Sequence, residues 1–203
     1  MNRENIIFIT GNYGKYASAK EKFASIGVTV EQIDLDIEEL AVSDVQEVSL
    51  DKAKKAYTAI NQPCFVEDSG FYIDAYPGKT NYPGTLVKRT GISQNVEKLL
   101  EIMKDIPNRN CHFLSCVTFY DGKVLHQFIT KNSGTLSYEV RGELKKEAKS
   151  RLFQVFIPQG STKTLAEIQS EGAKKNKTSK SSMQDFVNWY NDNLSVKCKI
   201  KIK

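Results

Sequence analysis

The chain has 203 residues, of which 40% are hydrophobic and 26% charged, and its formal net charge is +5. This composition is typical of a globular protein and predicts a single domain over residues 1–203 with a sizeable core. It excludes a membrane protein, because no apolar stretch approaches the ~20 residues that span a bilayer. The apolar run near Met1 is too short for a signal peptide, so we expect a cytoplasmic protein.

The excess positive charge lies in lysine-rich stretches such as "KKEAKSR", "KKNKTSK" and "KCKIKIK". Aromatic residues are not interleaved with these lysines, as a surface that stacks nucleic acid would require. We therefore expect an anionic small molecule as partner and consider nucleic acid unlikely. The four cysteines are scattered and no Cys-x-x-Cys pair occurs. Buried free thiols explain them better than a zinc site or a disulfide.

Strand and helix patterns alternate along the chain around a strand-rich middle, in which "YDGK" predicts a hairpin turn. This alternation predicts an α/β fold with a mixed twisted sheet, and we expect two lobes with a central cleft. The expected strands cover 5–12, 28–36, 63–69 and several segments of 110–140, and the expected helices cover 15–27, 43–60, 95–106 and 181–194, with a loop at 170–182.

The first predicted strand ends in "TGN", and a helix starts near Lys15. Exposed N–H groups at a helix start, with a lysine beside them, favour phosphate binding. A Walker A loop is excluded, because Gly11 and Gly14 are too close together and a tyrosine follows the lysine where that motif needs a hydroxyl residue. An ordinary strand-to-helix turn is the alternative interpretation.

Asp44 is followed three residues later by Glu47, which matches a variant of the capping box and predicts a helix start. That structural explanation accounts for Glu47. A carboxylate in a first helical turn can also face a metal across a cleft, so both alternatives stay open.

Two adjacent carboxylates, Glu67 and Asp68, follow an apolar run that we interpret as a buried strand ending at Val66. Strand ends of α/β sheets line ligand crevices. Carboxylates there favour magnesium that carries a polyphosphate, and a spare carboxylate is suited to deprotonate an attacking water. A solvated loop is the alternative. Lys88 and Arg89, after the turn in "YPGT", either reach phosphates or lie in solvent.

Taken together and in order, "TGNYGK", Glu47, "VEDSGFYIDA" and "YPGT" resemble the inosine triphosphate pyrophosphatase family. A weaker match continues through "SGTL" and "FIPQGSTKTLAEI", so that the resemblance runs from about Ile6 to about Trp189. It implies an elongated α/β fold with a cleft between two lobes, usually in a homodimer. It also implies magnesium-dependent hydrolysis of non-standard purine nucleoside triphosphates to nucleoside monophosphate and pyrophosphate.

The resemblance also implies roles for individual residues. Phosphate binding would fall to Thr10, Asn12 and Lys15, and Lys15 would also neutralise charge during catalysis.

The magnesium would be held by Glu47 and Asp68, and Asp68 would be the favoured base for the attacking water. Glu67 and Ser69 would support this catalytic site.

The segment that reads the base departs from the family pattern, Phe-Gly-(Trp or Tyr)-Asp-Pro-x-Phe. The corresponding run is "SRLFQVF", which keeps Phe156 but has Leu152 and Phe153 in place of the second aromatic residue and the aspartate. A site that loses polar partners for a base loses discrimination, so a preference for inosine or xanthosine does not follow. Phe153 and Arg151 are candidates for a different base contact, or belong to surface or core.

The family's Ser-His-Arg, which also contacts the purine, falls in "TSKSS". There Lys180 and Ser181 replace the histidine and the arginine, while Lys175 and Asn176 match the preceding Lys-Asn of the family. Lys175 and Lys180 are therefore expected to bind the substrate.

The leading hypothesis is a magnesium-dependent nucleoside triphosphate pyrophosphatase with altered or relaxed base choice. The alternative is a catalytically weak relative that binds a nucleotide as a sensor or partner domain. A complete metal site argues against that alternative. A basic nucleic-acid-binding protein is the third hypothesis, and it lacks a recognition motif.

Overall fold

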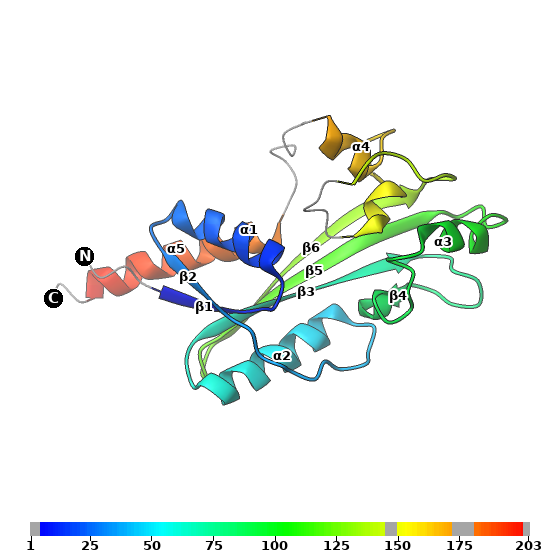
Figure 1. Cartoon of the computed structure of the whole chain (residues 1–203). Coiled ribbons are helices and arrows are strands. Elements are labelled where there is room, and N and C mark those ends of the chain that lie inside the picture. The colour runs from blue at the N-terminus through cyan, green and yellow to red at the C-terminus, as the bar shows by residue number, and fades with distance from the viewer. Residues whose placement is uncertain (1–4, 145–149, 172–180, 201–203) are drawn as a thin grey trace.

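The computed structural model describes residues 5–144, 150–171 and 181–200, and it shows an elongated molecule built on one sheet (Figure 1). Within this part of the chain the sheet has seven strands in the order β2-β1-β3-β5-β6-β7, and β4 pairs with β3. β1 is parallel to β2 and β3, whereas the other pairings are antiparallel. The mixed α/β sheet is thus confirmed. The strands are β1 Asn5–Ile9, β2 Thr29–Ile33, β3 Cys64–Ile73, β4 Tyr82–Gly84, β5 Asn110–Tyr120, β6 Leu125–Leu136 and β7 Phe156–Pro158.

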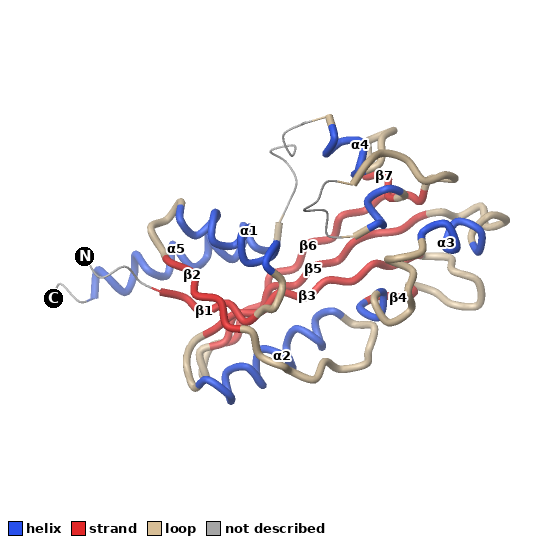
Figure 2. The backbone as a smooth tube through the Cα atoms, in the orientation of Figure 1, coloured by secondary structure: helices blue, strands red, loops and turns tan. Residues whose placement is uncertain are grey.

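Helices cover both faces of the sheet near β1, with α1 and α5 on one face and α2 on the other (Figures 1 and 2). At the far end of the long strands, α3 and α4 flank the sheet instead. The helices are α1 Tyr13–Ala24, α2 Val45–Ile60, α3 Val96–Ile102, α4 Leu165–Ser170 and α5 Ser182–Ile200, and the 3-10 turns are η1 Thr85–Val87 and η2 Arg151–Gln154.

Side chains of β3 alternate between the two faces and enter different cores. Phe65 packs with Phe186 of α5, so we name this side the α5 face. Val66 packs with Ala53 of α2, which defines the α2 face. Farther along the α5 face, Phe71 joins a second cluster with α3 and η2. The α5 face therefore carries two apolar clusters at its two ends, in agreement with the predicted lobes.

The prediction that a strand ends at Val66 is wrong. β3 continues to Ile73 and pairs with β5 along its whole length. Glu67 and Asp68 therefore lie in the middle of a strand, and their side chains point to opposite faces of the sheet. A small Ser-Gly step does not break the strand because the long partner β5 holds it in register.

One edge of β3 lacks a strand partner in its central part. β1 pairs with β3 at Cys64 and Phe65, and β4 pairs with it from Phe71 to Ile73. Among the described residues no strand lies between these two partners on that edge. Glu67 and Asp68 lie in this gap, where the edge of β3 is open to a ligand as the end of a strand would be.

The predicted helices are present, although the third is shorter than expected and ends at Ile102. Asp121 Oδ1 accepts hydrogen bonds from the N–H groups of Lys123 and Val124, which closes the predicted hairpin turn. Cys64, Cys111 and Cys116 are buried free thiols, as predicted. None of the described helices is long and apolar enough to cross a membrane.

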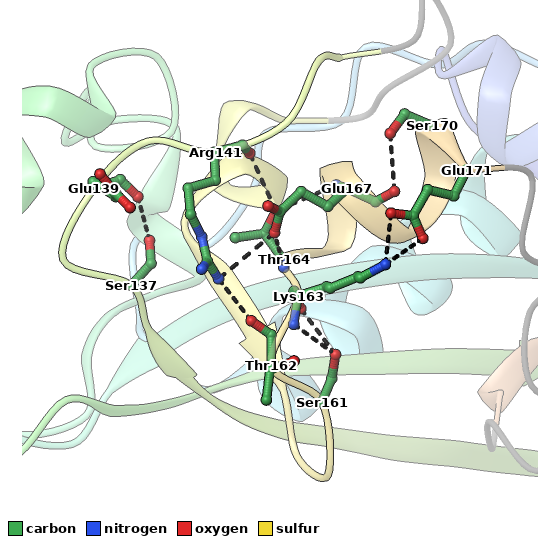
Figure 3. A network of polar contacts seen from close by, with 10 residues as sticks. All are labelled: Ser137, Glu139, Arg141, Ser161, Thr162, Lys163, Thr164, Glu167, Ser170 and Glu171. Atoms are coloured by element: carbon green, nitrogen blue, oxygen red, sulfur yellow. Dashed lines mark hydrogen bonds and ion pairs between the residues drawn. The ribbon is translucent and has the colours of Figure 1, made fainter.

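A polar network fixes α4 to the loop after β6 (Figure 3). Thr164 and Glu167 form a capping box, in which each side chain bonds the other residue's backbone N–H. Arg141 donates to the Thr162 carbonyl at 2.9 Å and lies 3.6 Å from the Glu167 carboxylate. Hydrogen bonds from the Thr164 backbone and hydroxyl lower the pKa of Glu167 despite the opposing effect of burial.

Candidate functional site

The turn between β1 and α1 brings together the residues predicted to bind phosphate. Asn12 caps α1 by accepting a hydrogen bond from the Lys15 N–H at 3.0 Å, and its own N–H donates to Thr10 Oγ1 at 3.1 Å. Lys15 Nζ donates to the backbone carbonyl of Glu67 at 2.7 Å, across the gap in the edge of β3. No acidic residue lies in the first turn of α1, so the positive end of the helix dipole stays available to an anion.

Gly11 lies against the side chain of Asp34 in this turn. A Cβ atom at Gly11 would lie 2.7 Å from a carboxylate oxygen of Asp34. A side chain at this position would therefore require the Asp34 carboxylate to move.

On the α2 face, Asp68 and Lys52 form a largely buried ion pair. Lys52 Nζ lies 3.3 Å from Asp68 Oδ1 and 2.7 Å from the carboxylate of Glu39. Asp68 is 8% exposed, and its second oxygen, Oδ2, is buried without a hydrogen-bond partner among the described residues. A buried carboxylate oxygen with no partner is unfavourable unless a ligand supplies one.

Electrostatics distinguishes the two carboxylates that share Lys52. Burial raises the pKa of Asp68 and outweighs the lowering effect of the charges on Lys52 and Lys15. Burial also acts to raise the pKa of Glu39, but its hydrogen bond and ion pair with Lys52, helped by Lys88 and Lys15, lower it overall. For Lys52 itself, burial opposes the charged form, yet Asp68 and Glu39 together raise its pKa. Lysine charges therefore converge on this side of the gap, where they favour an anionic ligand.

Glu67 and Ser69 do not share a face with Asp68. Both side chains point to the α5 face, Glu67 half-buried and Ser69 exposed. Glu67 is nevertheless tied to the site through its backbone carbonyl, which accepts the bond from Lys15. The five residues Thr10, Asn12, Lys15, Glu67 and Asp68 thus meet at the gap, with the two carboxylate side chains on opposite sides of the sheet.

Glu47 lies exposed in the first turn of α2. Asp44 caps this helix as predicted, but it accepts from the N–H of Gln46 rather than of Glu47. The two residues therefore do not form the predicted capping box. Among the described residues, no group of three or more histidine, cysteine, aspartate or glutamate side chains is arranged to hold a metal. The feature that fits a magnesium ion is the unpartnered Oδ2 of Asp68, because oxygen ligands suit this cation.

Lys52 and Glu39 belong to the site, although the sequence pattern did not predict them. Lys52 follows the buried Val48 by four residues and precedes the buried Ala56 by four, so it lies on the apolar stripe of α2. A lysine on the apolar stripe of a helix indicates a buried polar contact, so the sequence did contain a sign of this residue's role. Glu39 lies in the loop before α2, where no periodic pattern marks it. Arg89 Nη2 donates to the Glu39 carbonyl at 3.3 Å, so this loop also holds the arginine predicted to reach phosphates or solvent.

The rewritten base-reading segment is η2 and its flanks. Leu152 is buried, whereas Phe153 is half-buried and lies edge-on to Phe113, with ring centroids 6.0 Å apart. Arg151 is tied to α3, where it donates to the Glu97 carboxylate with both Nη atoms. Arg151 is therefore occupied by a structural contact, and Phe153 is the candidate that faces the sheet. Lys175 and Lys180 lie outside the described residues.

Comparison with known proteins shows the family and the fold. The model of the Ham1 family matches residues 6–189. A "dITP/XTP pyrophosphatase" of Methanopyrus kandleri is 30% identical over 196 residues, which cover 94% of this chain and 98% of the relative. A protein of the same name from Saccharolobus solfataricus is 33% identical over 166 residues, covering 80% and 81% of the two chains. The solved structure of a HAM1 protein from Coxiella burnetii is 19% identical, covers 93% of this chain and 99% of its own, and superposes with a TM-score of 0.75.

Proposed function

This chain belongs to the Ham1 family, and from that premise we propose that it hydrolyses nucleoside triphosphates to nucleoside monophosphate and pyrophosphate with the help of magnesium. Curated relatives that match most of the chain carry the name dITP/XTP pyrophosphatase, which supports this class of reaction. The observation that carries the proposal is the unpaired stretch at the edge of β3 between β1 and β4. Lys15, Lys52 and the unpartnered oxygen of Asp68 converge there.

The phosphates bind at the start of α1. Backbone N–H groups of the turn and the hydroxyl of Thr10 contact phosphate oxygens, and Lys15 turns from the Glu67 carbonyl toward the new anion. Lys52 faces the same gap from α2, so positive charges approach the triphosphate from both sides of the sheet. This arrangement stabilises the charge that develops on the phosphates as the bond between the α- and β-phosphates breaks.

Asp68 is the favoured base for the attacking water. Its Oδ1 atom is held by Lys52, while Oδ2 has no hydrogen-bond partner in the part of the chain that the structure describes. The raised pKa of Asp68 brings its carboxylate closer to the pH range in which a base accepts a proton efficiently. Glu67, on the α5 face, is the second candidate for this role.

Asp68 and Glu47 are the residues that would hold magnesium, and the bound ion would neutralise phosphate charge and orient the triphosphate. Glu47 lies exposed in the first turn of α2, where a cation in solvent can reach its carboxylate. The protein itself binds the triphosphate through its lysines and positions the attacking water on the rigid strands.

Pyrophosphate release from a panel of triphosphates tests the proposal. The panel covers inosine, xanthosine, the four standard bases and modified pyrimidines, each with and without magnesium, and Asp68→Asn serves as the matched variant. Release that requires magnesium and is lost in Asp68→Asn would support the proposal. Absence of release from every triphosphate by the folded protein would contradict it and favour the nucleotide-binding sensor.

Base choice and assembly complete the proposal. Because Leu152 and Phe153 replace the aromatic residue and the aspartate of the family pattern, we propose an altered or relaxed base preference, which the same panel measures. We also propose a homodimer, which light scattering of the purified protein tests.

A further inference from the structure

Hydrogen-bonding side chains join the first turns of α2 to the sheet on the α2 face. Gln127 of β6 donates through Nε2 to the Gln46 carbonyl at 3.0 Å and to Thr118 Oγ1 at 3.1 Å. The Thr118 hydroxyl in turn lies 2.7 Å from that of Ser49, one turn farther along α2. These contacts close a ring between the helix and two strands. We name it the polar clamp, and its members are Gln46, Ser49, Thr118 and Gln127.

The clamp has a direction, because each hydroxyl carries a single proton. Thr118 accepts from Gln127, so its own proton is donated to Ser49. Ser49 then donates to the Cys116 carbonyl at 3.4 Å. Cys116 is the register partner of Asp68 on β3. The chain of hydrogen bonds therefore leads from the first turn of α2 to the strand backbone opposite Asp68.

The hydroxyls of the clamp contribute position rather than stability. Ser49 and Thr118 are fully buried, whereas Gln127 is half-buried. A hydrogen bond between two buried hydroxyls mainly replaces bonds to water, so an apolar pair of the same shape would join helix and sheet about as firmly. A hydrogen bond, however, forms only over a narrow range of distances and angles. The clamp therefore specifies where α2 lies on the sheet.

The apolar contacts of α2 do not fix its first turns in the same way. The apolar cluster of the α2 face takes Ala53 and Ala56 from the later part of the helix. Apolar contact is non-directional, and a methyl group has little shape to oppose a small shift along the sheet. The site residues Glu47 and Lys52 precede this cluster, and Lys52 Nζ lies 3.3 Å from the Asp68 carboxylate. Their placement depends on the part of the helix that the clamp holds.

We propose that Thr118 is a positioning residue that, through the polar clamp, places Lys52 opposite Asp68. The inference rests on the proposed function and names the group that orients one of its lysines. Lys52 follows Ser49 by three residues, so the two lie one turn apart on the same side of α2. A shift of the helix by about 1 Å carries Lys52 with it, and misplacement on this scale lowers a rate by up to about 10²-fold.

Crystal structures and pyrophosphate-release kinetics of the full chain test the proposal, the kinetics with magnesium and the best triphosphate of the panel. Thr118→Val keeps the shape of the side chain and removes its hydroxyl, and Thr118→Ser keeps the hydroxyl. Gln127→Met opens the clamp at its half-buried end, where a substitution disturbs the core least. Thr164→Val is the control, because Thr164 is also fully buried and its hydroxyl donates to the Arg141 carbonyl beside α4.

In Thr118→Val and Gln127→Met, the distance from Lys52 Nζ to Asp68 Oδ1 should increase from 3.3 Å to beyond about 4 Å, the limit of an ion pair. We expect kcat to fall roughly ten-fold and KM to change by less than about two-fold, because Lys52 acts on the transition state while the α1 turn still binds the phosphates. Thr118→Ser should keep the original distance and kcat. Thr164→Val should lower the Tm with kcat unchanged.

An unchanged distance in both Thr118→Val and Gln127→Met would overturn the proposal, and so would a longer distance with unchanged kcat. A loss of kcat in Thr164→Val as large as in Thr118→Val would also overturn it, since destabilisation alone would then explain the effect. If the unsubstituted protein releases no pyrophosphate, the proposed function fails. The distance in the crystal structures still decides in that case whether the clamp positions Lys52.

Discussion

Two polar clusters of this protein contain the same types of residue, but they differ in whether their carboxylates are hydrogen-bonded within the chain. Around α4, Glu167 is bonded by the backbone and hydroxyl of Thr164, and Lys163 pairs with Glu171 at 2.6 Å (Figure 3). At the gap in β3, Asp68 is more deeply buried, yet one of its oxygens has no partner within the described residues.

The pKa values express the same difference. Hydrogen bonds lower the pKa of Glu167, so the fold favours its charged form. Burial raises the pKa of Asp68, so the fold opposes its charged form even with two lysines nearby. Polar groups that serve the fold are satisfied within the chain, whereas those at the gap are left for a ligand to satisfy.

The largest effect should follow from Asp68→Asn at the gap. The amide cannot accept the proton of the attacking water and is a poor magnesium ligand, so kcat/KM should fall roughly 10³-fold. The free energy of unfolding should stay the same or rise, because a charge that the fold opposes is removed. Steady-state kinetics and urea denaturation measure both. A clear loss of stability with retained activity would assign Asp68 to the fold instead.

Lys52→Met should affect activity and stability together. The methionine fills the space of the lysine stem but leaves Asp68 and Glu39 without their cation. We expect kcat/KM to fall roughly 10²-fold. The free energy of unfolding should fall by roughly 1–2 kcal/mol, less than for a fully buried pair because Glu39 is half exposed.

Lys55→Met provides the control on the same helix. Lys55 pairs with Asp51 one turn away at 2.7 Å and is more exposed than Lys52. Activity should be unchanged in this variant. If both lysine variants lose activity alike, the loss at Lys52 reflects the helix and not the gap.

Glu167→Ala should produce a smaller effect, confined to stability. Loss of the capping box should lower the free energy of unfolding by about 1 kcal/mol, with kcat/KM unchanged. Glu171→Ala, which removes only the exposed pair with Lys163, should cost no more than about 0.5 kcal/mol. Thermal unfolding of the two variants tests the order. A drop in kcat/KM for Glu167→Ala would show that α4 contributes to the site.

Glu167 and Asp68 should also make the free energy of unfolding depend on pH, with opposite signs. This is the smallest of the expected effects. The folded pKa of Glu167 is lowered, so its contribution is present above the unfolded value and is lost as the pH falls through the folded value. The folded pKa of Asp68 is raised, so its neutral form favours folding below the unfolded value, and this contribution is lost as the pH rises through the folded value.

Urea denaturation between pH 3 and pH 7 measures both contributions as differences from Glu167→Gln and Asp68→Asn. Toward the neutral end of the range, Glu167→Gln should lower the free energy of unfolding, whereas Asp68→Asn should raise it. Differences of the same sign would contradict the contrast between the clusters.

Sequence periodicity predicted the longer helices and strands because each of them presents one apolar side to a core, but it did not predict the short elements β4, β7 and α4. It failed at β3, where the apolar pattern pauses at Glu67 and Asp68 while the pairing with β5 continues. The alternation of a strand places these neighbours on opposite faces, which no reading of them as a strand end could show.

Long-range contacts explain the rest of the difference. Glu39 and Lys52 meet Asp68 only through the packing of α2 and its preceding loop on β3. In contrast, the phosphate-binding turn was predictable because Thr10, Asn12 and Lys15 are neighbours in sequence and organise themselves by local hydrogen bonds.

The gap in β3 has a consequence for aggregation. An unpaired strand edge invites the backbone of another chain to add to the sheet, and proteins protect such edges with charge, above all with lysine. Here the bond from Lys15 to the Glu67 carbonyl occupies one of the exposed acceptors, and β1 and β4 limit the free stretch at both ends. The lysine that we propose to bind phosphate thus also protects the free edge of β3. Replacing it should favour intermolecular strand pairing and lower the affinity for the substrate.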